Sequence, residues 1–168
     1  MMRRTSSIKV VLVISLILNV IIGVLLYNSY LINKDKIVGD SLEYSRFINR
    51  LERYVYYLDQ AGKQTTSNEI MNSLINADKR LNLAEKSLDK FNNSMSATDL
   101  IASRITLIIE DIDEANFRLL SQYALYNNGE EKIADIKKSI DRLLDAIPKE
   151  YSIEKKSEFI KKINNLSY

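Results

Sequence analysis

Residues 70–91, IMNSLINADKRLNLAEKSLDKF, show the periodicity that decides the fold class. Apolar side chains recur there at alternating steps of four and three residues: Ile70, Leu74, Ala77, Leu81, Ala84, Leu88 and Phe91. Such spacing places all of them on one face of an α-helix, whereas a half-buried β-strand would alternate every two residues. The stretch therefore predicts an amphipathic helix, from about residue 67 to residue 92, that packs its apolar face against other helices.

The same spacing recurs on both sides of this stretch. It predicts one helix before it, at about residues 35–61, and two after it, at about residues 97–127 and 130–147. In the predicted helix at about residues 35–61, the expected core positions are Ile37, Tyr44, Ile48, Leu51, Val55 and Leu58. Since no stretch alternates with a period of two, we expect an all-α protein.

Short polar breaks separate the predicted helices. Thr66 and Glu69 form a capping box before the second helix, and residues 127–129, Asn-Asn-Gly, stop the third. Pro148 ends the fourth helix, and Ser152 opens a short fifth segment. Because short loops join antiparallel neighbours, we predict an up-down antiparallel four-helix bundle whose last helix is broken near Pro148. The alternative is a five-helix arrangement with the final segment folded across one end.

An uncharged apolar run, VVLVISLILNVIIGVLLY, occupies residues 10–27. At about 1.5 Å per residue this run spans roughly 27 Å, close to the thickness of a bilayer's hydrocarbon core. A buried core helix would show a polar side, and a cleaved signal peptide would show small residues at a cleavage site. The run shows neither, so we expect an uncleaved transmembrane signal anchor at residues 10–32.

The charges around this run predict its orientation. Arg3, Arg4 and Lys9 are the only charged residues before residue 34. The positive-inside rule then places residues 1–9 in the cytoplasm and the helical domain, residues 33–168, outside it. The expected location is the cell membrane, in which the protein spans the bilayer once.

Ser15, Asn19 and Gly23 recur every four residues within the apolar run. They therefore share one helical face, and small or polar residues on such a face allow close contact between membrane helices. The face is a candidate surface for homo-oligomerisation, although a lone anchor tolerates the same residues.

The composition excludes several classes of chemistry. The chain has no His and no Cys, which removes the commonest general base, thiol nucleophiles, disulfides and thiolate metal sites. Its carboxylate cluster on the third predicted helix, at residues 110–114, lacks the loop spacing of a calcium site. No glycine-rich phosphate-binding loop is present. We therefore expect that the protein is not an enzyme and that it holds no cofactor and no metal centre.

The formal net charge of +2 comes from 24 Lys and Arg residues and 22 Asp and Glu residues. Three of the basic residues precede residue 34, so the remainder of the chain holds 21 basic and 22 acidic residues. Such a balanced body predicts no nucleic-acid binding. Arg46, Arg50 and Arg53 form a basic stripe that we expect to be a solvated helix face.

Five of the ten tyrosines fall near the ends of the first and third predicted helices: Tyr54, Tyr56, Tyr57, Tyr123 and Tyr126. In an up-down bundle these ends meet at the tip farthest from the bilayer. Tyrosine is enriched in interfaces, so the group is a candidate partner-binding surface. The preferred alternative is that these large rings fill the end of the core, although adjacent Tyr56 and Tyr57 cannot both face inward.

The function expected from these features is that of a membrane-anchored helical bundle acting by protein–protein interaction. Such a protein is an adaptor, an accessory subunit or an inhibitor in an envelope process, and the abundance of Ile, Asn and Lys suggests a bacterial source. One alternative is a ligand-sensing four-helix-bundle ectodomain that signals through a partner. Another is a coiled-coil structural spacer.

Overall fold

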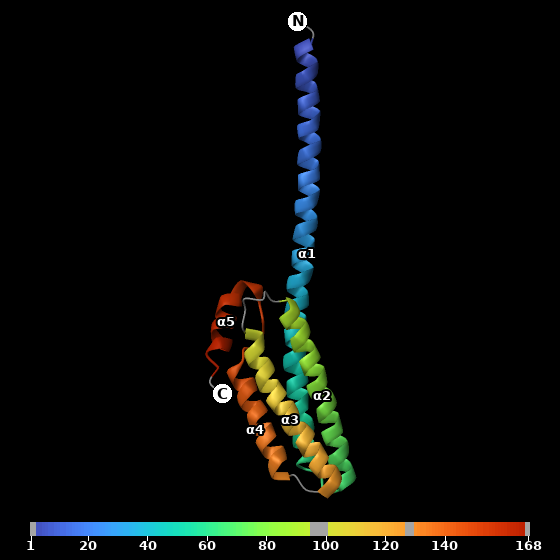
Figure 1. Ribbon diagram of the computed structural model, residues 1–168, viewed down its shortest axis with the longest axis vertical. Helices are drawn as coiled ribbons and strands as arrows, with labels where there is room; N and C mark the ends of the chain where they lie inside the picture. Colours follow the sequence, from blue (N-terminus) through green and yellow to red (C-terminus); the bar gives the residue numbers. More distant parts are fainter. Residues whose placement is uncertain (1–2, 95–100, 127–129, 167–168) are drawn as a thin grey trace. The chain divides into compact units, whose positions relative to one another are not determined.

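The computed structural model describes residues 3–94, 101–126 and 130–166 (Figure 1). Its elements are α1 (Arg3–Ala61), α2 (Ser67–Ser94), α3 (Ile101–Tyr126), α4 (Glu130–Ala146), the 3-10 turn η1 (Ile153–Lys155) and α5 (Lys156–Asn164). These described residues contain no β-strand. The predicted all-α fold class is therefore confirmed.

The chain divides into two compact units, Met1–Val38 and Gly39–Tyr168. The first unit consists of the N-terminal part of α1. Among the described residues α1 is the one helix that is long and apolar enough to cross a membrane, and none of its apolar window is buried. The limits expected for the cytoplasmic end, the anchor and the outer domain (1–9, 10–32 and 33–168) stay predictions.

The second unit has one apolar core to which all its α-helices contribute. All seven apolar positions predicted in residues 70–91 are buried, as the spacing requires. The core positions of α3 and α4 follow the same spacing: Ile105, Ile108, Ile112, Leu119, Ile133, Ile136, Ile140 and Leu143. Full burial of one such aliphatic side chain contributes about 1.5–3 kcal/mol, so this apolar face is what holds each helix in place.

The register of the first predicted helix differs from the prediction at two positions. Ile37 is 36% exposed, and Val55 is only partly buried, whereas Tyr54 is fully buried. Residues 54 and 55 both satisfy the spacing between Leu51 and Leu58, so periodicity alone does not choose between them. Tyr54 takes the core position, where its hydroxyl has a buried hydrogen-bond partner on α3.

The helices of the second unit contact one another through several pairs. α2 packs against α3, and α3 also packs against α4 and α5. Residues 39–61 of α1 reach α2 through Arg50, which donates to the Leu83 carbonyl at 2.7 Å. This part of α1 also reaches α4, where Lys137 lies 3.9 Å from the Asp59 carboxylate.

An aromatic cluster holds the segment that follows α4. The rings of Tyr44, Phe91, Tyr151 and Phe159 lie 4.9–6.4 Å apart between centroids. The Tyr44 hydroxyl donates to the Pro148 carbonyl at 2.6 Å. Because Pro148 lacks a backbone N–H, the chain leaves the helix after Ala146, and this cluster fixes its new course.

Candidate functional site

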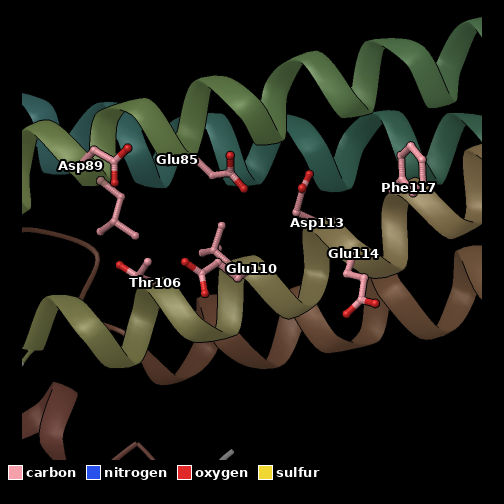
Figure 2. Close-up of a pocket in the computed structure, with 9 residues that line it drawn as sticks. Glu85, Asp89, Thr106, Glu110, Asp113, Glu114 and Phe117 are labelled. Atoms are coloured by element: carbon pink, nitrogen blue, oxygen red, sulfur yellow. The ribbon is translucent and has the colours of Figure 1, made fainter.

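A groove of about 460 Å³ lies between α2 and α3 (Figure 2). Nine described residues line it: Glu85, Leu88, Asp89, Thr106, Ile109, Glu110, Asp113, Glu114 and Phe117. Five of these carry a carboxylate, and none of the nine carries a positive charge. The groove therefore presents an acidic wall on each of two neighbouring helices.

Helical spacing explains why these carboxylates gather. Glu85 and Asp89 are four residues apart on α2, and Glu110, Asp113 and Phe117 follow at steps of three and four on α3. Residues with this spacing share a face. Leu88 and Ile109 lie beside them and are 2% and 1% exposed, so the two acidic faces border the apolar core directly.

The groove raises the pKa of two of its carboxyl groups. Burial, together with the charges of Asp113, Asp89, Asp78 and Glu110, raises the pKa of Glu85 to about 7. Burial and the charge of Asp78 also raise the pKa of Asp113. Removing water and adding like charges both disfavour an ionised carboxylate. The nine lining residues thus supply no positive charge to offset the carboxylates of Glu85 and Asp113.

The outer edge of the groove combines charge with an exposed aromatic ring. Glu114 forms an ion pair with Arg118, and both side chains are more than half exposed. Phe117 is 68% exposed. Two more large apolar side chains of α3, Leu107 and Leu125, are 59% and 73% exposed. Of these three apolar side chains, Phe117 is the one that lines the groove.

A partly buried hydrogen-bond chain links α3 to α1 and α2. The Tyr54 hydroxyl donates to Asn116 Oδ1 at 3.1 Å, and Asn116 Nδ2 donates to Asp78 Oδ1 at 2.9 Å. Asn116 is fully buried, and burial followed by the charges of Asp113 and Asp78 raises the pKa of Tyr54. These bonds join α1, α2 and α3. The sequence signal for Asn116 is its place in the four-three register between Ile112 and Leu119.

The sequence predicted that Arg50 lies on a solvated helix face, but its guanidinium has partners on α2. Besides its bond to the Leu83 carbonyl, its guanidinium donates to Ser87 Oγ. Ser87 in turn donates to the Glu43 carboxylate at 3.2 Å. Arg50 therefore joins α1 to α2.

The five tyrosines predicted as a partner-binding surface have different environments. Tyr54 and Tyr123 are buried, and Tyr57 is partly buried with the Arg80 guanidinium 5.8 Å from its ring centroid. Tyr56 is 57% exposed and contacts Tyr57 edge to face. The side chain of Tyr126 lies outside the described residues. The partner-binding role of these tyrosines stays a prediction.

The candidate association face of the apolar run lies in the first unit. Ser15, Asn19 and Gly23 are exposed there, and a Cβ added at Gly23 would meet no atom within 4 Å. Helix association through this face stays a prediction. In the part of the chain that the structure describes, no three acidic side chains are arranged to hold a metal ion.

No family model, curated protein or solved structure matches the chain.

Proposed function

We propose that this protein is a single-pass membrane protein whose helical unit binds another protein through the α2–α3 groove. The observation that carries the proposal is the set of five carboxylates in a groove whose nine lining residues include no basic one. The partner surface that fits is a basic segment with an apolar side chain to meet Phe117. The protein would act as an adaptor, an accessory subunit or an inhibitor.

The architecture proposed for this protein is an N-terminal anchor followed by an up-down antiparallel four-helix bundle broken near Pro148. Short connections support this topology, since only residues 62–66 separate α1 from α2, and residues 127–129 separate α3 from α4. We propose that residues 1–9 are cytoplasmic and that the bundle lies outside the cytoplasm. The basic residues before the apolar run support this orientation.

Charge complementarity supports a protein partner at the groove. Glu85 and Asp113 are partly buried, so water screens their mutual repulsion less than it screens the charges of the exposed Asp89, Glu110 and Glu114. A Lys or Arg side chain that enters the groove removes this repulsion and forms charge-assisted hydrogen bonds. Phe117 then supplies the aromatic contact that often dominates binding energy in protein interfaces.

Site-specific photocrosslinking from residue 117 tests this proposal in membranes of cells that produce the protein. A photoreactive phenylalanine at Phe117 should give one crosslinked product, and the same group at Lys138, exposed on α4, should not. The triple variant E85Q/E110Q/E114Q should lose the product because it removes three groove charges.

A matched variant separates groove charge from total charge. E150Q/E154Q/E158Q removes three exposed carboxylates that lie outside the α2–α3 groove, so its crosslinking yield should stay at the wild-type level. Equal losses in the two triple variants would contradict a specific role for the groove.

A further inference from the structure

The groove carboxylates act on one another across the helix interface. Glu85 lies on α2 with Asp78 and Asp89, and faces Glu110 and Asp113 from α3. All four neighbours oppose its ionisation, and burial acts in the same direction. Figure 2 shows the Glu85 and Asp113 side chains in the space between the two helices.

Two arginines of neighbouring elements have partners that do not include Glu85. Arg50 of α1, which packs on α2, is bonded to the Leu83 carbonyl and to Ser87. Arg118 of α3 is paired with Glu114 at the outer edge. None of the nine lining residues is basic, so either a proton or a positive group from a partner lowers the repulsion among the groove carboxylates.

We propose that the α2–α3 groove is a proton-linked docking surface, in which Glu85 holds a proton in mild acid and releases it when a cationic partner group binds. The release of the proton when the partner binds (the release half) rests on the proposed function. The protonation of Glu85 in mild acid (the proton half) concerns this chain alone. Binding of the partner should therefore strengthen as the pH rises from about 5.5 to 8 and should release up to one proton to solvent.

The sign of the effect on stability follows from the direction of the shift. The pKa of Glu85 is about 7 in the folded protein, against an ordinary value of 4.5. The folded state thus holds a proton that the unfolded state has lost between these two values. Its contribution to stability is fully present below about pH 4.5 and is lost as the pH rises through about 7.

Carbon-13 NMR of the full chain in detergent micelles tests the proton half directly. With labelled glutamate, and with E85Q to assign the signal, the Glu85 carboxyl should titrate with a midpoint near pH 7. The D113N variant should move that midpoint to lower pH, because Asp113 is the strongest of the charges that act on Glu85. A wild-type midpoint below about pH 5 would overturn the inference.

Thermal unfolding of the same preparations gives a second readout. E85Q should raise the unfolding midpoint more at pH 8.5 than at pH 5.5, because the wild-type protein has lost only part of the Glu85 contribution at the lower pH. The control E154Q, in the exposed η1 turn, should behave alike at both pH values. An E85Q effect of equal size at both pH values would overturn the proton half.

Crosslinking from residue 117 at pH 5.5 and pH 8 tests the release half. The wild-type yield should be higher at pH 8, and E85Q should remove most of this difference. A specific product whose yield does not change with pH would leave the docking function standing and overturn the proton link. If Glu85 titrates near pH 7 but residue 117 gives no specific product, the proposed function fails and the proton half stands.

Discussion

Replacement of Asn116 by Ala tests the hydrogen-bond chain that positions α3. Asn116 is fully buried, accepts a bond from the Tyr54 hydroxyl and donates one to Asp78. Two lost bonds cost about 1 kcal/mol each, and the Tyr54 hydroxyl left without a partner adds roughly 1–2 kcal/mol. We therefore expect N116A to lower the free energy of unfolding by about 3–4 kcal/mol.

A double-mutant cycle isolates the bond between Tyr54 and Asn116. Y54F alone should cost about 1–2 kcal/mol because it leaves Asn116 Oδ1 without its donor. In the Y54F background the N116A change no longer strands a buried hydroxyl. The double variant should therefore be more stable than the sum of the single effects predicts, by about 1 kcal/mol.

Guanidinium denaturation followed by circular dichroism provides the measurement. Residues 39–168 are suitable because they form a compact unit that contains the three hydrogen-bonded side chains, Tyr54, Asn116 and Asp78. The slope of unfolding free energy against denaturant should stay unchanged across the four proteins. Additive effects, with a coupling below about 0.3 kcal/mol, would refute the hydrogen-bond chain.

Two further predictions concern the core and the break after α4. L74A removes a side chain that is 0% exposed and should cost about 2–5 kcal/mol in the same denaturation assay; a loss below about 1 kcal/mol would mean that α2 uses another apolar face. Y44F removes the donor to the Pro148 carbonyl and should cost about 0.5–1.5 kcal/mol, with faster amide hydrogen exchange in residues 149–152. Unchanged exchange in that segment would argue against its attachment through Tyr44.

Apolar spacing predicted the helices and most core positions because the repeat of apolar residues at steps of three and four lies within each helix. Leu74 and Ile140 are fully buried, as expected for residues in the four-three register. The spacing did not distinguish Tyr54 from Val55, because both fit between Leu51 and Leu58. That choice depends on a hydrogen-bond partner 62 positions away in the sequence.

The candidate site was predictable only in part, for a related reason. The carboxylates at residues 110–114 form a cluster that the sequence shows. The spacing of apolar residues alone does not show which residues of α2 face this cluster. Glu85 and Asp89 enter the groove through the packing of two helices, and that register depends on side-chain shape across the interface. The aromatic cluster at Tyr44 likewise joins residues separated by more than one hundred positions.

The most direct measurement of the central claim is the crosslinking yield from residue 117 relative to that from Lys138 in the same membranes. The proposed docking function predicts a specific product from residue 117 that E85Q/E110Q/E114Q removes and E150Q/E154Q/E158Q retains. Equal yields from residues 117 and 138, or equal yields from the two triple variants, would contradict it.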